Sequence, residues 1–212
     1  MAKEFLTGNE AFAHAVLEAG VRVCAGYPGT PSSEVIETVA KEHAAGRAEG
    51  VHVEWSTNEK AALELLAGAA YSGARTLYTC KQVGLNVASD ALMSLNYVGV
   101  KGGTVLYVAD DPGPISSQTE QDTRHFSRFS KLPCFDPSSA QEAYEMIQEA
   151  FEYSEEYGTP VFLRPTTRVC HGYASVTVKD DKEFTQHKPE GFIKDSKRWV
   201  IFPRLSFMNH QK

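Results

Sequence analysis

The chain lacks the patterns that mark several common classes of protein. Its longest apolar runs fall far short of the ~18 residues of a membrane-spanning helix, and its first residues form no signal-peptide core. We therefore expect no membrane partner and a cytoplasmic location. The 27 acidic residues outnumber the 21 basic ones and are scattered, for a net charge of −6, which argues against nucleic acid as a partner.

Metal ligands and activated nucleophiles are also sparse. The four cysteines stand alone at positions 24, 80, 134 and 170, without a C-x-x-C pair, and none of the seven histidines has i, i+4 spacing. This argues against a metal site or an iron–sulfur cluster within the chain. No serine lies on a G-x-S-x-G elbow, and the G-x-x-x-x-G-K-[ST] order of a phosphate-binding P-loop is missing.

What the chain does contain is a regular alternation of helix and strand patterns. Short, continuously apolar runs predict strands at 21–27, 51–55, 75–80, 104–109 and 161–163. Helical patterns lie at about 7–20, 30–46, 58–72, 85–98 and 138–157, with a short surface helix within 116–131. Helices between buried strands indicate βαβ crossovers, so we predict a doubly wound α/β fold, a mostly parallel sheet with helices on both faces.

The pattern changes after about His171. Residues 174–178 alternate like an exposed edge strand, and residues 179–212 are charged, irregular and weakly periodic. We therefore predict a domain at 1–178, followed at 179–212 by an extended linker or tail that leads toward a missing diphosphate-binding domain.

Three of the predicted helices begin with capping residues. Thr7 and Glu10 form a capping box, and Ser138 with Gln141 forms a second one. Thr30 is placed to cap the helix after the first strand. Proline then occupies the first helical position, where the missing N–H would have no partner anyway. These caps predict where the helices begin.

The Gly-Tyr-Pro-Gly-Thr-Pro-Ser-Ser turn after the first strand is a candidate ligand site. Gly26 and Gly29 allow close backbone approach, and Pro28 and Pro31 stiffen the loop around Thr30. Because the turn follows a parallel strand, its hydroxyls and the free amides of the next helix would face a ligand at the sheet edge. An ordinary strand-to-helix turn explains these residues equally well, and the sequence leaves both interpretations open.

Glu59, at the start of an alanine-rich helix, is a second candidate. The apolar residues of that helix predict a buried stripe formed by Ala62, Leu65, Leu66 and Ala69. At ~100° per residue, Glu59 falls about 70° from the centre of this stripe, whereas Glu64 falls about 150° away and is solvated. We therefore expect the Glu59 carboxyl to be partly desolvated. The alternative is a glutamate that only stabilises the positive end of the helix dipole.

Two further loops follow predicted strands. In the Lys-Gln-Val-Gly-Leu-Asn segment after the third strand, Gly84 permits close backbone approach, and Lys81 or Gln82 could contact a ligand. The alternative there is a helix start with a solvated lysine. After the fourth strand, Asp110 and Asp111 suggest a metal, but hard cations need more oxygen ligands from a defined scaffold. A capped turn is the favoured interpretation.

In order along the chain, these loops resemble the pyrimidine-binding domain of the 2-oxoacid:ferredoxin oxidoreductase family, in particular the alpha subunits of indolepyruvate ferredoxin oxidoreductases. The matching stretches lie at 26–34, 54–60, 81–88, 109–113, 116–122 and 166–168, within residues 7 to about 178. The resemblance implies thiamine diphosphate as the cofactor. It also implies oxidative decarboxylation of arylpyruvates such as indolepyruvate to aryl-acetyl-CoA, with coenzyme A as acyl acceptor and ferredoxin as electron acceptor.

The same resemblance assigns roles to individual residues. The family's catalytic glutamate falls on Glu59, where it contacts the pyrimidine ring nitrogen and favours the tautomer that removes the C2 proton. Thr30 matches a threonine that lies near the 2-oxo acid. The other positions implied to bind the cofactor are Pro28, Gly29, Gln82, Val83 and Gly84. The protein then orients and tunes a cofactor that carries the organic chemistry.

Two segments of the family are missing from these 212 residues. One is the diphosphate-binding Gly-Asp-Gly…Asn segment that chelates magnesium, and the other is the cysteine-rich ferredoxin-like region. Mg and 4Fe–4S clusters are therefore expected on diphosphate-binding and ferredoxin-like domains or subunits, with a beta subunit and ferredoxin as further partners. We expect the chain to work in a homo- or hetero-oligomer and to be inactive alone.

Substrate recognition departs from the family as well. Related pyruvate enzymes place a substrate arginine after the fourth strand, where this chain has Asp110 and Asp111. The substrate carboxylate must then be bound by Arg124, by loop amides or by the partner subunit. Two other functions are compatible with the sequence: a non-catalytic interaction or regulatory module that retains the fold, and a component of a non-oxidative 2-oxo acid decarboxylase.

Overall fold

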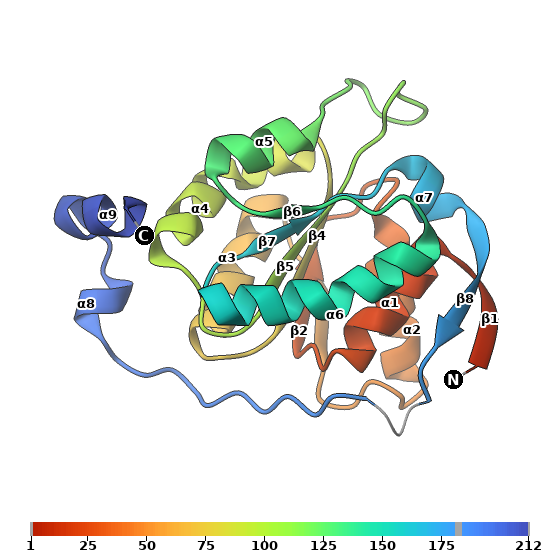
Figure 1. Ribbon diagram of the computed structural model, residues 1–212, viewed down its shortest axis with the longest axis horizontal. Helices are drawn as coiled ribbons and strands as arrows, with labels where there is room; N and C mark the ends of the chain where they lie inside the picture. The colour runs from red at the N-terminus through yellow and green to blue at the C-terminus, as the bar shows by residue number, and fades with distance from the viewer. Residues whose placement is uncertain (1, 181–183, 212) are drawn as a thin grey trace.

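The computed structural model describes residues 2–180 and 184–211, and a six-stranded parallel sheet forms its centre (Figure 1). The strands are β2 (Val23–Gly26), β3 (His52–Trp55), β4 (Thr76–Lys81), β5 (Thr104–Ala109), β6 (Cys134–Phe135) and β7 (Val161–Leu163). Their order across the sheet is β3-β2-β4-β5-β7-β6, and all neighbouring pairs are parallel. The predicted α/β fold is confirmed.

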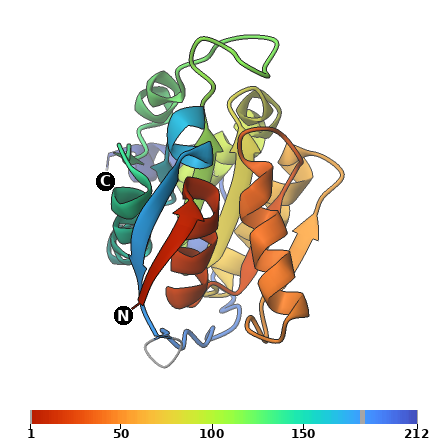
Figure 2. The same ribbon diagram turned by 90° about the vertical axis from the view of Figure 1, so that its right-hand side faces the viewer.

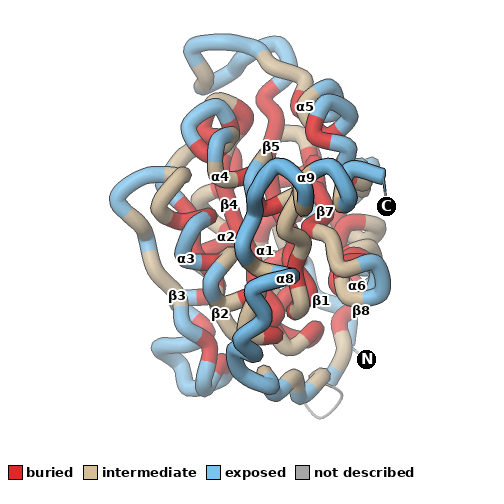
Figure 3. Tube along the Cα trace, turned by 90° about the vertical axis from the view of Figure 1, so that its left-hand side faces the viewer, coloured by how far each residue is buried: buried red, intermediate tan, exposed pale blue. Residues whose placement is uncertain are grey.

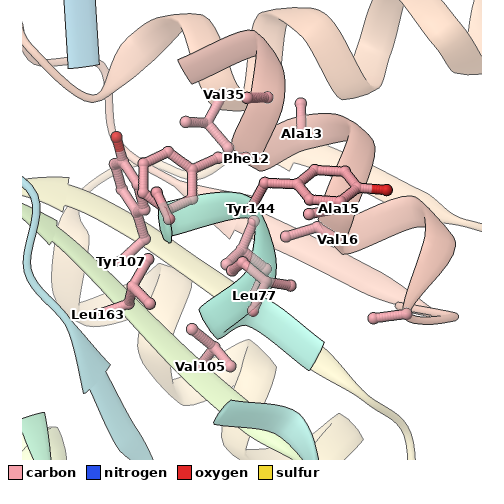
Figure 4. Close-up of a cluster of buried hydrophobic side chains, with 14 of the residues drawn as sticks. Phe12, Ala13, Ala15, Val16, Val35, Leu77, Val105, Tyr107, Tyr144 and Leu163 are labelled. Atoms are coloured by element: carbon pink, nitrogen blue, oxygen red, sulfur yellow. The ribbon is translucent and has the colours of Figure 1, made fainter. Parts of the chain in front are cut away.

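Helices cover both faces of the sheet, as the sequence predicts. One face carries α1 (Gly8–Glu18), α2 (Ser33–Ala44) and α6 (Ala140–Tyr157), and the other carries α3 (Glu59–Tyr71), α4 (Gly84–Val98) and α5 (Thr123–Ser130). The apolar side chains between the sheet and α1, α2 and α6 form one buried cluster, part of which is shown in Figure 4. In this cluster, Phe12 of α1 packs edge-on against Tyr107 of β5 with ring centroids 4.7 Å apart.

The central strand β5 is an almost continuous apolar run because both faces of the sheet are buried there. In β5, Val105 and Tyr107 belong to the cluster under α1 and α6, whereas Leu106 and Val108 belong to the cluster under α3 and α4. This alternation fixes the register, since a shift by one residue would exchange the two faces.

A separate antiparallel ribbon pairs β1 (Ala2–Thr7) with β8 (Tyr173–Val178), and Figure 2 shows the two strands side by side. On its exposed side, the rings of Phe5 and Tyr173 stack with centroids 5.3 Å apart. The sequence predicts β8 as an exposed strand. It does not predict β1, which is mostly exposed and pairs with residues from the far end of the sheet domain.

The predicted helix starts are right in one case and shifted in two. The Thr7–Glu10 capping box of α1 is confirmed. The Ser138–Gln141 box is wrong by one residue, because the N-cap of α6 is Ser139, whose hydroxyl accepts from the N–H of Glu142 at 3.2 Å. The hydroxyl of Ser138 instead donates to the Glu142 carboxylate at 2.5 Å.

The predicted start of α2 is also wrong. This helix begins at Ser33, so Thr30 does not cap it and Pro31 is not its first residue. The preceding turn closes on itself, since the N–H and hydroxyl of Ser32 both donate to the carbonyl of Gly29, at 2.8 and 2.7 Å. These bonds delay the helix and leave the Thr30 side chain exposed.

The tail runs along the outside of the domain (Figures 1 and 3) and contains two short helices that the sequence does not predict, α8 (Ser196–Trp199) and α9 (Pro203–His210). Neither helix has a buried residue. Backbone and side-chain bonds tether the tail, among them Thr185 N to the Glu18 carbonyl at 2.8 Å. The division at residue 178 stays a prediction, and residues 181–183 and 212 of the predicted tail lie outside the described residues.

Among the described residues, no helix combines the length and the apolar character needed to cross a lipid bilayer.

Candidate functional site

The strand order creates a switch point between β2 and β4. From β2 the chain passes through α2 to β3, and it then crosses back through α3 to β4 on the other side of β2. The loops after β2 and β4 therefore leave the carboxyl edge of the sheet toward helices on opposite faces. In open α/β sheets, ligands bind at such a switch point.

One buried asparagine anchors the loop after β2. The Asn9 amide donates to the Pro31 carbonyl and to a Glu34 carboxylate oxygen, both at 2.7 Å, and its oxygen accepts from the Tyr107 hydroxyl. These bonds hold the loop in place while Thr30 stays exposed. The sequence does not reveal this role, because the partners of Asn9 lie 22, 25 and 98 residues away along the chain.

Two glycines bring this loop close to β4. A Cβ atom added to Gly26 would overlap the side-chain and carbonyl oxygens of Thr79. A Cβ atom added to Gly29 would lie 3.0 Å from Cγ and 3.1 Å from Cδ of Lys81. The close backbone approach predicted for these glycines is therefore present, and the stem of Lys81 lies across the loop next to Thr30.

Glu59 lies at the same edge, on the opposite face. It is the first residue of α3, and the N-cap Asn58 accepts from the N–H of Ala61 at 2.8 Å. A Cβ atom added to Gly84 would lie 2.5 Å from Oε1 of Glu59, so the carboxyl rests against the first backbone residue of α4. In the part of the chain that the structure describes, the Glu59 carboxylate has no hydrogen bond or ion pair.

The buried stripe of α3 differs from the predicted one. It consists of Ala62, Leu63, Leu66 and Ala70. Leu65, which the prediction placed inside, is 37% exposed. With the corrected stripe, Glu59 falls within roughly 10° of the stripe centre at ~100° per residue, rather than about 70° away. The half-buried carboxyl therefore points along the apolar face of the helix, which strengthens the prediction of partial desolvation.

Gln82 and Tyr78 supply further buried polar atoms at and near the end of β4. Gln82 is fully buried; its amide nitrogen donates to the Thr119 carbonyl at 3.2 Å. Its Oε1 and the Tyr78 hydroxyl have no hydrogen-bond partner within the described ranges. Burial, with smaller contributions from Cys80 and the charge of Glu59, raises the pKa of Tyr78 well above its usual value, so the phenol remains a proton donor.

The loop after β5 is a capped turn, in agreement with the favoured interpretation. The Asp111 carboxylate accepts from the backbone N–H groups of residues 115, 116 and 117 at 2.9–3.0 Å and from the Thr167 hydroxyl at 2.7 Å. Burial alone would raise the pKa of Asp111, but the hydrogen bonds from Ser116, Thr167 and Ser117 lower it to about 2. No cluster of potential metal ligands occurs within 2–180 and 184–211.

Asp110 belongs to a buried ion pair. Its carboxylate accepts from Arg164 Nε at 2.7 Å and from both the N–H and the hydroxyl of Thr123, at 3.0 and 2.7 Å. Arg164 also approaches Asp136 at 3.3 Å. These contacts join β5, the start of α5 and the end of β7, so the pair is structural.

Arg124, one of the predicted carboxylate-binding groups, already has partners. Its guanidinium donates to Asp122 at 2.6–3.2 Å and lies 3.5 Å from Asp136. These hydrogen bonds and charges lower the pKa of Asp122 and raise that of Arg124. The guanidinium is therefore less available to bind the carboxylate of a substrate.

A cavity of about 790 Å³ lies elsewhere, between α9 and the carboxyl-terminal ends of α4 and α6. Helices in a parallel sheet run opposite to the strands, so this cavity is at the amino edge of the sheet. The tail forms one of its walls. We place the functional site at the switch point instead, because the unpaired polar groups gather there.

This doubly wound domain, with its polar switch point, belongs to a family of thiamine diphosphate-binding domains. The matching family is described as "Pyruvate flavodoxin/ferredoxin oxidoreductase, thiamine diP-bdg", and its model covers residues 14–201.

Among curated proteins, the chain is similar to subunits of indolepyruvate oxidoreductases. It is 48% identical to "Indolepyruvate oxidoreductase subunit IorA" of Methanothermobacter thermautotrophicus over 99% of this chain and 33% of the relative. The subunit of the same name from Pyrococcus abyssi is 45% identical over 97% of this chain and 32% of the relative. The resemblance drawn from the loop motifs is confirmed. The chain spans about a third of the length of these relatives.

A solved structure supports the fold. A 2-oxoglutarate:ferredoxin oxidoreductase from Magnetococcus marinus, solved with 2-oxoglutarate, coenzyme A and succinyl-CoA, matches 88% of this chain and 33% of its own with a TM-score of 0.77. At 18% identity, this likeness concerns the fold alone.

The structure therefore brings the predicted residues together in two contacts. Gly29, in the loop with Pro28 and Thr30, contacts Lys81. Gly84, which follows Gln82 and Val83, contacts Glu59. Pro28 is exposed and Val83 half-buried. The roles of these residues toward a cofactor or substrate stay predictions.

Proposed function

We propose that this chain forms the pyrimidine half of a thiamine diphosphate site in an arylpyruvate oxidoreductase that uses ferredoxin. The Glu59 carboxylate is the observation that carries the proposal. It rests against Gly84, half-buried, and has no hydrogen-bond or ion-pair partner within the described ranges. Desolvating a carboxylate without a partner costs free energy, and a ligand that completes the site would offset this cost.

The residues present fit the pyrimidine end of the cofactor. An aminopyrimidine offers a ring nitrogen and an amino group. Glu59 can share a proton with the ring nitrogen, and Oε1 of Gln82 is a buried acceptor without a described partner. Gly84 leaves open the space that a side chain would fill beside Glu59. Pro28, Gly29 and the backbone of Val83 would border the ring, and Thr30 would face the substrate.

Thiamine diphosphate, when bound, supplies a nucleophilic carbon for attack on a 2-oxo acid and an electron sink for decarboxylation. The part of this chain is to bind and orient the ring and to hold the proton that Glu59 shares with it. A half-buried carboxyl on the apolar face of α3 suits this role, because its low-dielectric surroundings strengthen a charge-assisted hydrogen bond.

The names of the relatives guide the choice of substrate and partners. Since the relatives are subunits of indolepyruvate oxidoreductases, we assign indolepyruvate or a similar arylpyruvate as substrate, coenzyme A as acyl acceptor and ferredoxin as electron acceptor. This chain covers 33% of the first relative. Mg and 4Fe–4S clusters are therefore assigned to diphosphate-binding and ferredoxin-like regions outside it, and a beta subunit, an oligomeric assembly and a cytoplasmic location complete the proposal.

The two other candidate functions fit the site less well. A non-catalytic module gains nothing from leaving Glu59, Lys81 and Gln82 Oε1 without partners at one edge. A non-oxidative decarboxylase would use the same residues but release an aldehyde. The product therefore separates this reaction from the proposed one.

The test is Glu59→Gln in the assembled enzyme, with all domains and the partner subunit supplied. Indolepyruvate-dependent reduction of ferredoxin is measured as thiamine diphosphate is added. We expect a loss of activity of at least about 100-fold, since the amide cannot share a proton with the ring nitrogen. The control is Glu64→Gln, on the exposed side of the same helix, which should change the rate by less than about twofold.

Full activity of the Glu59→Gln assembly would contradict the proposal. Aldehyde formation by the unaltered assembly, without reduction of ferredoxin, would support the non-oxidative decarboxylase instead.

A further inference from the structure

We propose that Lys81 binds the carboxylate of the 2-oxo acid substrate. This inference rests on the function proposed above and assigns the group that recognises the substrate. Lys81 is the last residue of β4, and its side chain is half-buried at the carboxyl edge of the sheet. This is the edge at which the loop of Thr30 and the carboxyl of Glu59 also lie.

The position of the stem fixes where the ammonium group can act. Cγ and Cδ of Lys81 would lie 3.0 and 3.1 Å from a Cβ atom on Gly29, so the aliphatic stem packs on the residue before Thr30. Three residues further along the chain, Gly84 contacts Glu59. Lys81 thus packs on the loop that would face the substrate, and it lies three residues before the glycine that contacts the carboxyl that would hold the cofactor.

The ammonium group is available for a ligand. Within residues 2–180 and 184–211, Nζ of Lys81 has no hydrogen bond or ion pair, and Glu59 does not pair with it. Other cations at this edge are already paired: Arg164 with Asp110 at 2.7 Å, Arg124 with Asp122 at 2.6 Å. The predicted arginine is therefore the weaker candidate.

The chemistry of a 2-oxo acid suits a lysine at this place. Its carboxylate is bonded directly to the carbonyl carbon that reacts, so the group that binds it must lie close to the reacting carbon. A half-buried ammonium is a compact cation, and it forms charge-assisted hydrogen bonds that are stronger than those in water. Aliphatic packing against Gly29 also restricts the stem, so less conformational entropy is lost on binding.

One alternative cation must be tested together with Lys81. Arg168, in α7 (Thr167–His171), is exposed, and its guanidinium has no partner in the described part of the chain. The atoms nearest to an added Cβ at Gly29 and at Gly84 belong to Lys81 and to Glu59, not to Arg168. We therefore expect KM for the substrate to change when Lys81 is replaced and to stay unchanged when Arg168 is replaced.

The experiment uses the assembled enzyme and compares Lys81→Met, Lys81→Arg and Arg168→Met, with Lys60→Met as control. Methionine keeps an unbranched apolar stem over Gly29 but removes the charge. KM for indolepyruvate, kcat and the concentration of thiamine diphosphate that gives half-maximal activity are measured for each variant. Thermal unfolding of each assembly is followed as a check of folding.

We expect Lys81→Met to raise KM for indolepyruvate about 10- to 100-fold, the range for loss of a charge-assisted hydrogen bond. The thiamine diphosphate requirement should stay within about twofold of the unaltered enzyme, and Lys81→Arg should recover most of the affinity. Lys60 pairs with Asp90 on the surface, so its replacement should leave all three constants unchanged.

An unchanged KM in Lys81→Met would overturn the inference, and so would a KM effect in Arg168→Met alone. A parallel rise in the thiamine diphosphate requirement would also overturn it, because the lysine would then act on the cofactor. If the unaltered assembly shows no thiamine-dependent turnover of indolepyruvate, the proposed function itself fails. The two failures are therefore distinguishable.

Discussion

The two halves of the carboxyl edge differ in how their charged groups are paired. On the β5–β7 side, Asp110 is held by Arg164 and Thr123, and Asp111 by three backbone N–H groups and a hydroxyl. On the β2–β4 side, Glu59 and Lys81 lie at the same edge without partners in the described residues. The buried carboxylates of one half are paired within the chain, whereas the carboxylate and ammonium groups of the other half have free hydrogen-bonding capacity.

This difference separates groups that hold the fold from groups that bind a ligand. A buried charge pair is costly to break, because either partner alone pays the full desolvation penalty. An unpaired half-buried charge instead lowers the stability of the folded chain locally. A functional site tolerates this loss when a bound ligand supplies the missing partner. Substitutions on the β5–β7 side should therefore reduce stability, and substitutions on the β2–β4 side should reduce activity.

The largest effect on stability is expected for Asp110→Ala. It leaves the Arg164 guanidinium, 8% exposed, without its 2.7 Å partner, although Asp136 remains at 3.3 Å. We expect the free energy of unfolding to fall by about 3 kcal/mol, measured by chemical denaturation. The control Asp90→Ala removes an exposed ion pair with Lys60 and should cost less than about 0.5 kcal/mol. Equal losses in the two variants would contradict a structural role for the buried pair.

On the β2–β4 side, Gly84→Ala should lower the activity of the assembled enzyme. The added Cβ would lie 2.5 Å from Oε1 of Glu59 and would displace the carboxyl. We expect roughly a 100-fold loss of thiamine-dependent activity in the assembled enzyme, since misplacing a catalytic group by about 1 Å has an effect of this size.

A second helical glycine provides the matched control. Gly68 of α3 has nothing within 4 Å of an added Cβ, and Gly68→Ala should stabilise the helix by about 0.5–1 kcal/mol with unchanged activity. If Gly84→Ala retained full activity, the contact between Glu59 and α4 would have no part in the function.

The smallest effect concerns pH. Hydrogen bonds lower the pKa of Asp111 to about 2 in the folded chain, against an ordinary value of 3.8. Its contribution to stability is therefore complete above about pH 4 and is lost as the pH falls toward 2. With solvent screening, we expect this contribution to be about 1 kcal/mol.

Asp111→Asn should flatten the stability profile between about pH 4 and pH 2, which chemical denaturation at several pH values can measure. An acid limb as steep as that of the unaltered chain would show that other carboxyl groups account for it.

Much of the fold can be predicted from the sequence, because the strands of the parallel sheet are buried on both faces. The run that became β5 is apolar at nearly every position, β4 combines apolar residues with threonine, and both lie between clear helical patterns. Besides α8 and α9 of the tail, three elements were missed for physical reasons. β6 has two residues, α7 has five, and β1 is mostly exposed and depends on pairing with a strand from the other end of the domain.

The site was predictable in part. Helical geometry selected Glu59 as a candidate, although Leu65 shifted the predicted stripe because an apolar side chain is no guarantee of burial. The role of Glu59 stays a prediction. Gly29 and Gly84 were selected as candidates because glycine permits a close approach to the backbone, and the structure places Lys81 and Glu59 against them. Asn9 was missed, because its bonds depend on tertiary contacts that no local pattern encodes. The sequence also could not predict that the Lys81 ammonium has no partner in the described residues, since ion pairing depends on the folded arrangement.

The most direct measurement is a crystal structure of the assembled enzyme with thiamine diphosphate, read at the distance between the Glu59 carboxylate and the nearest nitrogen of the pyrimidine ring. We predict a hydrogen bond of about 2.6–3.2 Å, with the ring bordered by Gly84. A separation beyond about 3.5 Å, with another side chain bound to that nitrogen, would contradict the central claim that the unpaired half of this edge is a cofactor site.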